Sequence, residues 1–194
     1  MALQRSQGDT LIKILDVAEA RIRSNGFNDF SFRDIAADVG IKSASVHYHF
    51  PTKSDLGVRV TRRYTARFLH YLGDPEDKNN APAELLLHYI NGYKKFLIDD
   101  EAMCLCGMLG AELASLPEPV REEVKRFNED NVEWLKRVYQ RLNPKDKKKK
   151  AKTKALHLLA SMQGAMIVAR TLNEPKLFDR ISKEFLGGAK NLVA

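Results

Sequence analysis

The chain has 194 residues, of which 44% are apolar and 29% charged, proportions typical of a soluble protein with one substantial core. No segment approaches the roughly 18 uninterrupted apolar residues of a membrane span, and the first residues lack the apolar core of a secretory signal, so we expect a cytoplasmic protein. The net charge is +7, but residues 145–154 supply six of these charges, so the basic excess alone does not predict a nucleic-acid surface.

The chain begins with a polar stretch over residues 1–8, which we expect to be a disordered arm. A first helix is predicted from about Asp9 to Ser24, because Leu11, Leu15 and Ile22 recur at helical spacing. The pair that follows, Asn25-Gly26, is a helix stop. This helix is expected to brace the segment after it.

Two short helices joined by a glycine turn are predicted next. Ser31 and Asp34 form a capping-box-like start, and Gly40 can adopt the left-handed conformation that ends a helix. The second helix runs over residues 42–49 with Val46 turned inward and a polar face left outside. This layout is typical of a helix-turn-helix, whose second helix enters the DNA major groove.

The rest of the chain is expected to be helical throughout, with no alternating strand pattern, so the fold class is all-α. Asp74 to Ala81 is predicted to be a polar linker. The expected helices run over 53–72, from 82 through 97, over 102–115, over 119–142, over about 151–171, and through 177–186. Residues 145–154 are expected to be a solvated, mobile loop between two helices, with an auxiliary polyanion contact as the alternative.

Several short motifs near the N-terminus resemble the DNA-binding domain of the TetR family of transcriptional regulators. They are Gly26-Phe27, Phe32-Arg33-Asp34-Ile35-Ala36, Val39-Gly40-Ile41 and Tyr48-His49-Phe50-Pro51-Thr52-Lys53-Ser54-Asp55-Leu56. The resemblance covers roughly residues 10–60. It implies a three-helix helix-turn-helix domain over 9–52 and a larger helical ligand-binding and dimerisation domain over 53–194, with the dimer bundle from about 151–193.

The resemblance also implies which residues contact DNA. Base-reading positions are Ser43, Ala44, Ser45 and His47, and backbone-contacting positions are Tyr48, His49 and Lys53. Arg33 matches a DNA contact from the preceding helix. Lys42, also assigned to the interface, departs from the Ser or Thr that is common there, so Ser43 has two open roles, as helix cap or as base contact. His47 stands at a position where the family often has Tyr. Because the reading face carries no Arg or Asn, we expect modest base discrimination per half-site, with DNA shape adding the rest.

A small-molecule pocket is implied in the central helices. Its candidate residues are His88, Tyr93, Phe96, Met103, Cys104, Met108, Phe127, Asn128, Asn131, Trp134 and Met162. For any one of these residues, packing in the core is the alternative role.

The last two helices are expected to form a homodimer interface, as the corresponding helices do in the family. Candidate residues are Ala160, Gly164, Val168, Phe178, Ile181 and Phe185. Gly164 lowers helix propensity by about 1 kcal/mol relative to Ala, which suggests a packing reason for it.

The resemblance implies a ligand-responsive repressor that binds a palindromic operator as a dimer and is released by a small, largely apolar inducer. One alternative is a thiol-based sensor in which Cys104 or Cys106 reacts with an electrophile or oxidant. A more remote alternative is a helical protein-interaction module that does not bind DNA. We expect neither an enzyme nor a metal or other cofactor, because His47 and His49 point to different helix faces and no nucleophile–base set is recognisable.

Overall fold

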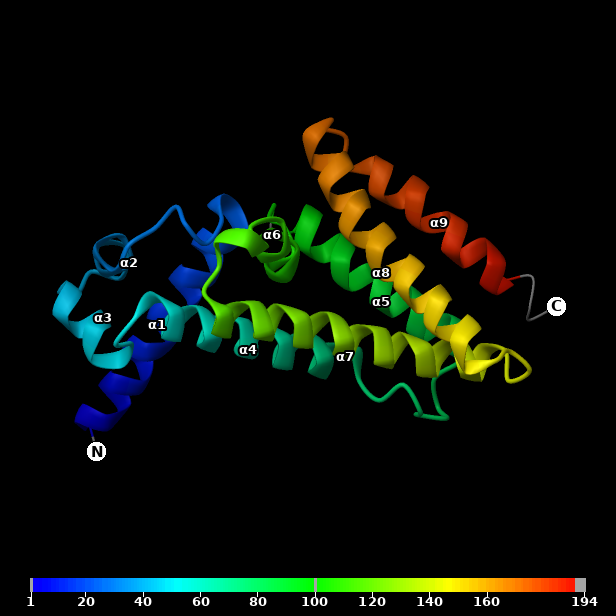
Figure 1. Ribbon diagram of the computed structural model, residues 1–194, viewed down its shortest axis with the longest axis horizontal. Coiled ribbons are helices and arrows are strands. Elements are labelled where there is room, and N and C mark those ends of the chain that lie inside the picture. The colour runs from blue at the N-terminus through cyan, green and yellow to red at the C-terminus, as the bar shows by residue number, and fades with distance from the viewer. Residues whose placement is uncertain (1, 100, 191–194) are drawn as a thin grey trace. The chain divides into compact units, whose positions relative to one another are not determined.

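A computed structural model describes residues 2–99 and 101–190, and within these ranges the structure contains helices and no strand (Figure 1). The helices are α1 (Ala2–Asn25), α2 (Phe32–Val39), α3 (Ser43–His49), α4 (Lys53–Leu72), α5 (Pro82–Ile98), α6 (Leu105–Ala111), the short 3-10 helix η1 (Leu113–Ser115), α7 (Glu118–Leu142), α8 (Lys148–Thr171) and α9 (Lys176–Lys190). The all-α prediction is therefore confirmed. The helix expected over 53–72 has the predicted bounds.

The chain divides into two compact units, which are described separately. Unit 1 comprises residues 1–65 and 105–125, and unit 2 comprises residues 66–104 and 126–194. Helices α4 and α7 each contribute residues to both units.

Unit 1 packs α1, α2 and α3 together with the first part of α4 and with α6. Its core includes the fully buried side chains of Ile14, Ile22, Ile35 and Leu56. Polar contacts add to this packing, since Arg21 Nε lies 2.7 Å from the Asp38 carboxylate and so links α1 to α2. These contacts fix the position of the two short helices.

Unit 2 is built from α5, α8 and α9, which contact one another, with the remaining parts of α4 and α7. Its core is rich in aromatic rings: Phe68 lies 5.5–5.9 Å, centroid to centroid, from Tyr89, Tyr93, Phe96 and Phe127. Gly92 allows this packing, because a Cβ there would lie 3.0 Å or less from Phe68 and Tyr71 ring atoms.

Three expected boundaries differ from the structure. Helix α1 begins at Ala2 rather than near Asp9, so residues 2–8 are helical where a disordered arm was expected. The helix expected over 102–115 is instead α6 followed by η1, with Glu101 in a left-handed conformation (φ 48°) ahead of it.

The third difference concerns the lysine-rich segment, where α8 begins at Lys148, inside the loop expected over 145–154. Asp146 explains this early start. Its carboxylate lies 2.8 Å from both Lys150 Nζ and Lys154 Nζ, and these two contacts hold the pKa of Asp146 below its usual range. One carboxylate before the first turn thus offsets part of the repulsion among the lysines.

Candidate functional site

Both ends of α2 are fixed by local hydrogen bonds, which set the direction in which α3 leaves. The carboxylate of Asp34 accepts hydrogen bonds from the hydroxyl and the N–H of Ser31, both at 2.7 Å, and these bonds lower the pKa of Asp34. Gly40 has φ 75°, and Ile41 N–H donates to Ala36 O at 2.9 Å. The predicted capping box and left-handed glycine are therefore confirmed.

Helix α3 is anchored by one buried apolar residue and exposes three others on one face. Val46 is fully buried, whereas Ala44, His47 and Tyr48 are exposed and recur at helical spacing. Tyr48 is 74% exposed, far more than an aromatic ring packed in a core. The structure thus places these three base- and backbone-contacting candidates together on one free face.

The remaining DNA-contact candidates surround this face. Ser43, Ser45 and His49 are half-buried, while Arg33 and Lys42 are exposed. Lys42 precedes α3 with extended backbone and makes no side-chain cap, and Ser43 is the first helical residue. Ser43 therefore lies within the helix, one residue after the cap position.

The ammonium of Lys53, a predicted phosphate contact, is turned toward the protein in this structure. Its Nζ donates to the carbonyl of Phe30 and lies 4.2 Å and 4.9 Å from the ring centroids of Phe30 and Phe27. Burial lowers the pKa of Lys53. In this conformation Lys53 links the start of α4 to the segment before α2.

Lys53→Ala is expected to lower the free energy of unfolding by about 1–2 kcal/mol, since it removes a hydrogen bond from a charged donor. Affinity for the DNA operator expected from the sequence should fall as a consequence. The slope of log affinity against log salt concentration should nevertheless stay within about 0.3 of the slope for the unmodified protein. A true phosphate contact contributes about 0.9 to that slope. Denaturant unfolding and salt-dependent binding measure the two effects. Lys125→Ala, at an exposed lysine of the same unit outside the predicted DNA interface, is the matched control and should leave both unchanged. A slope reduced by about one with unchanged stability would instead assign Lys53 to phosphate.

A second fixing contact joins the turn before α2 to a segment far along the chain. Glu112 Oε2 accepts a hydrogen bond from Phe27 N–H at 2.8 Å, and Asn28 Nδ2 donates to Ser115 Oγ at 2.8 Å. Gly26 makes this approach possible: it has φ 95°, and a Cβ there would lie 1.9 Å from Glu112 Oε1. We call this set the Glu112 contact. The sequence marks Gly26 as a helix stop but gives no signal for a partner that lies 85 residues beyond Phe27.

Most residues predicted to line a ligand pocket instead fill the core of unit 2. Fully or almost fully buried are Tyr93, Met103, Cys104, Phe127, Asn131, Trp134 and Met162, and Phe96 is half-buried. The half-buried His88 stacks on the ring of Tyr71, with 4.0 Å between the ring centroids, and its Nε2 lies 2.7 Å from the carbonyl oxygen of Tyr71. Met108 belongs to unit 1. The predicted set therefore does not line one cavity of unit 2.

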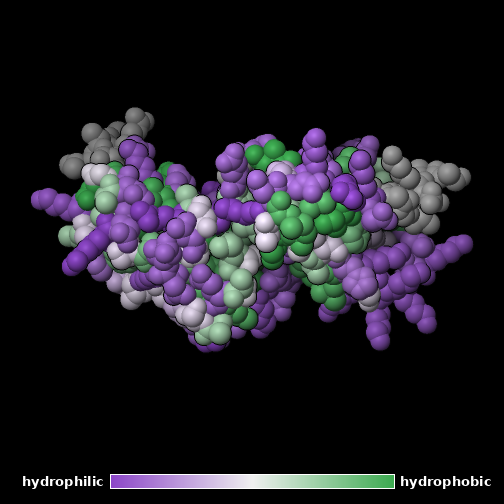
Figure 2. Space-filling view, turned by 90° about the horizontal axis from the view of Figure 1, so that it is seen from above, coloured by the Kyte–Doolittle hydropathy of each residue, from purple (hydrophilic) through white to green (hydrophobic). Residues whose placement is uncertain are grey.

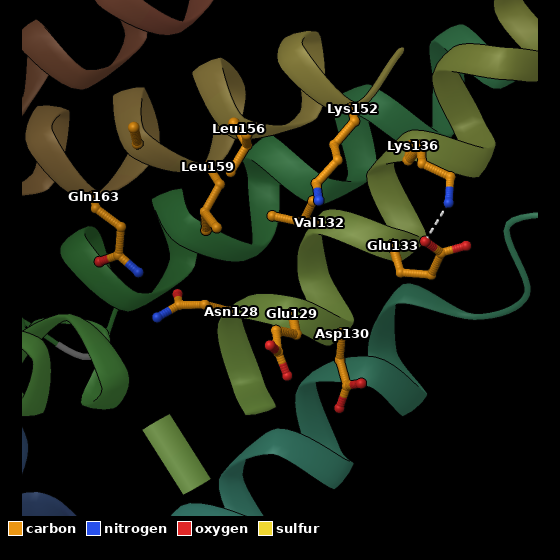
Figure 3. A pocket seen from close by; sticks show the side chains of 11 residues that line it. Asn128, Glu129, Asp130, Val132, Glu133, Lys136, Lys152, Leu156, Leu159 and Gln163 are labelled. Carbon is orange, nitrogen blue, oxygen red and sulfur yellow. Dashed lines mark hydrogen bonds and ion pairs between the residues drawn. The ribbon is translucent and has the colours of Figure 1, made fainter. Parts of the chain in front are cut away.

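A groove of about 720 Å³ does lie in unit 2, between α7 and α8 (Figure 3). Its lining residues are Asn128, Glu129, Asp130, Val132, Glu133, Lys136, Lys152, Leu156, Leu159, Ala160 and Gln163. Asn128 is the single member of the predicted pocket set among them. Of the six α7 residues in the lining, four are charged, a composition that does not by itself indicate a pocket.

The dimer candidates divide into exposed and buried residues. Ala160 and Val168 are exposed, and Gly164, Ile181 and Phe185 are half-buried. Phe178 is fully buried within the chain and offers no surface, so its assignment to an interface is corrected. Figure 2 views the molecule from the top of Figure 1, where α8 and α9 lie. Apolar surface gathers over this part of unit 2.

Cys104 and Cys106 are free thiols with 0% and 2% exposure. Reaction with an electrophile or oxidant requires access to the thiolate, so this burial does not favour the thiol-sensor alternative. Within residues 2–99 and 101–190, no helix combines the length and hydropathy needed to cross a bilayer. The same part of the chain holds no cluster of three His, Cys, Asp or Glu side chains suited to a metal ion.

Comparison with known proteins identifies relatives over the N-terminal helices and over the whole fold. The family model described as "Bacterial regulatory proteins, tetR family" matches residues 14–60. A curated relative, the biofilm operon icaADBC HTH-type negative transcriptional regulator IcaR of Staphylococcus epidermidis, is 26% identical over 113 residues. That match spans 58% of this chain and 58% of the length of IcaR.

Two solved structures are similar over nearly their full length. A TetR transcriptional regulator from Legionella pneumophila is 32% identical, with a TM-score of 0.84 over 91% of this chain and 94% of its own. A TetR-family transcriptional regulator from Agrobacterium tumefaciens is 30% identical, with a TM-score of 0.86 over 93% of this chain and 97% of its own.

Proposed function

The chain belongs to the TetR family of transcriptional regulators, and we propose that it is a repressor that binds a palindromic operator as a homodimer. In this proposal a small, largely apolar effector releases it from DNA. The observation that carries the proposal is the exposed face of α3, with Tyr48 at 74% exposure beside Ala44 and His47. The negative regulation named for the relative IcaR favours repression over activation. We assign no enzymatic role, in keeping with the family.

The residues around α3 suit the two kinds of contact that operator binding needs. Hydroxyls of Ser43 and Ser45 can donate to or accept from base edges, and the methyl group of Ala44 can contact a thymine methyl. Arg33 and Tyr48 are both exposed, which suits the contacts with the DNA backbone proposed for them. A helix of seven residues spans few base pairs, so a second copy is needed for a full operator.

An exposed apolar face of α8 supports the dimer. Ala160, Ile167 and Val168 are exposed and share the face that includes Gly164. A Cβ at Gly164 would meet nothing within 4 Å in its own chain, which leaves room for another helix to approach. The proposed interface is therefore this α8 face together with Ile181 and Phe185 of α9.

Release by an effector requires that the effector bind a non-DNA conformation more tightly than the DNA-binding one. Helix α4 is the proposed connection, because residues 53–65 belong to unit 1 and residues 66–72 to unit 2. A shift of α4 would then change the separation of the two α3 helices in the dimer.

A gel-shift titration against the DNA upstream of the chain's own gene tests the proposal. Tyr48→Ala is expected to weaken binding to all sequences about tenfold without loss of stability, because the ring is exposed and its contact is with the backbone. Ile12→Ala, an exposed apolar change on α1, is the control and should bind normally. If intact dimers bind no palindrome at low salt, the interaction-module alternative replaces the repressor.

A further inference from the structure

Two of the five histidines of the chain lie in the last turn of α3, the helix proposed to contact DNA. His47 is exposed, and its ring centroid lies 4.7 Å from that of the buried Phe32 on α2, edge to face. Aromatic pairs favour this arrangement, which limits the orientations of the exposed ring. His49 is half-buried and lies edge to face against Tyr48, at 5.2 Å. His47 is therefore the α3 histidine that is both held in place and open to a partner.

Both nitrogens of the His47 ring are free to bind a partner outside the chain. Within the described residues, the side chain of His47 forms no hydrogen bond or ion pair, and its ring contact is with the apolar Phe32. A neutral imidazole has one N–H donor, whereas the protonated ring has two donors and a positive charge. The exposed ring can therefore gain a donor and a charge without a change in the fold.

The carboxylates on α2 and in the first turn of α4, the helices on either side of α3 in the sequence, already have partners. They are Asp34 with Ser31, Asp38 with Arg21, and Asp55 with Thr52, at 2.7 Å in each case. The other charged side chains of this surface are cations. Arg33 and Lys42 are exposed, and Lys53 is turned toward Phe30. A protonated His47 thus finds no uncommitted carboxylate on these helices, whereas a DNA phosphate would supply a negative charge.

We propose that protonated His47 binds a DNA phosphate, so that DNA binding takes up a proton from solvent at each protomer and strengthens as the pH falls from 8 to 6. An imidazole exchanges its proton in this range. A phosphate oxygen close to the ring favours the protonated form. Because the complex then holds more protons than the free protein, linkage requires tighter binding at lower pH. The proposal rests on the DNA binding proposed above, and it gives His47 a backbone contact in place of the base-reading role implied by the sequence.

Binding measured from pH 6 to pH 8 at constant ionic strength tests the proposal. The probes are the DNA upstream of the chain's own gene and an unrelated duplex of equal length. We expect the unmodified protein to bind both duplexes about tenfold more tightly at pH 6 than at pH 8. His47→Gln keeps a neutral polar side chain, and its affinity should differ less than about threefold between the two pH values. His70→Gln, at an exposed histidine of unit 2, is the matched control and should keep the full pH dependence.

The salt dependence of binding tests whether the proton creates a phosphate contact. Each phosphate that a protein cation neutralises adds about 0.9 to the slope of log affinity against log salt concentration. The slope for the unmodified protein should therefore be steeper at pH 6 than at pH 8, by up to about 0.9 for each protomer. The slope for His47→Gln should be the same at both pH values. His47→Lys, which carries a permanent cation, should bind at pH 8 about as tightly as the unmodified protein does at pH 6.

Three results would overturn the role of His47. They are equal affinity of the unmodified protein at pH 6 and pH 8, a pH dependence that His47→Gln retains, and a pH dependence confined to the upstream DNA. The last result would indicate a base contact, because phosphates are present in every duplex. Each of these results leaves the repressor proposal standing, since the upstream DNA is still bound. Failure to bind either duplex at pH 6 and low salt would overturn both proposals.

Discussion

Val168→Glu is expected to convert the proposed dimer into monomers and to lower affinity for a full palindrome by roughly 100-fold or more. A loss of this size is usual when two binding sites that were joined in one molecule must bind separately. Val168 is 43% exposed and adjoins Ile167, which is 52% exposed, on the proposed α8 face. A carboxylate buried without a partner in that interface would be strongly destabilising. Sedimentation equilibrium measures the dimer, and gel shifts with full and half operators measure binding.

Leu87→Glu is the matched control, because Leu87 is 42% exposed on α5 of the same unit and lies outside the proposed face. This variant should remain dimeric and bind the operator normally. Gly164→Ala gives an independent test. Alanine raises helix propensity by about 1 kcal/mol and meets no atom of its own chain, so an exposed site would simply be stabilised. At a close helix–helix contact it should weaken the dimer instead. A dimeric Val168→Glu variant with full affinity would refute the interface.

Features set by neighbours a few residues apart could be predicted from the sequence. The Ser31–Asp34 cap, the left-handed Gly40 and the start of α5 at Pro82 each depend on backbone groups within one helical turn. The burial of Val46 follows in the same way from helical spacing. These local rules fixed the bounds of α2 and α3 and hence the exposed α3 face.

Features that depend on distant contacts could not be predicted. The lysines of residues 148–154 indicated a loop, because like charges close together in the sequence repel one another. The ion pairs of Lys150 and Lys154 with Asp146 form only in the folded chain, so they could not be predicted. The inward turn of Lys53 depends likewise on Phe30, 23 residues away. Aromatic and methionine residues of unit 2 suit a core and a pocket equally well by composition, and burial assigned them to the core.

Glu112→Ala is expected to lower the free energy of unfolding of unit 1 by about 2 kcal/mol, because it leaves the Phe27 N–H without its acceptor. The turn at residues 26–28 precedes α2, so freeing it should also loosen α3 and reduce operator affinity about tenfold. Denaturant unfolding, hydrogen exchange at the Phe27 amide and gel shifts measure these effects. Glu118→Ala is the control, since Glu118 is exposed and pairs locally with Arg121. Unchanged exchange at Phe27 would show that the contact is not formed in solution.

A double-mutant cycle with Gly26→Ala separates the two causes of instability at this turn. Gly26→Ala alone should cost about 2–3 kcal/mol, because a φ of 95° is strained for alanine and the new Cβ, 1.9 Å from Glu112 Oε1, displaces that carboxylate from Phe27. Once Glu112 has been replaced by alanine, only the backbone strain remains, about 1 kcal/mol. The two substitutions should therefore be less than additive by about 1–2 kcal/mol, the coupling expected for residues that share one contact. Strict additivity would mean that glycine is required at position 26 for its backbone alone, and that Glu112 stabilises the turn independently of it.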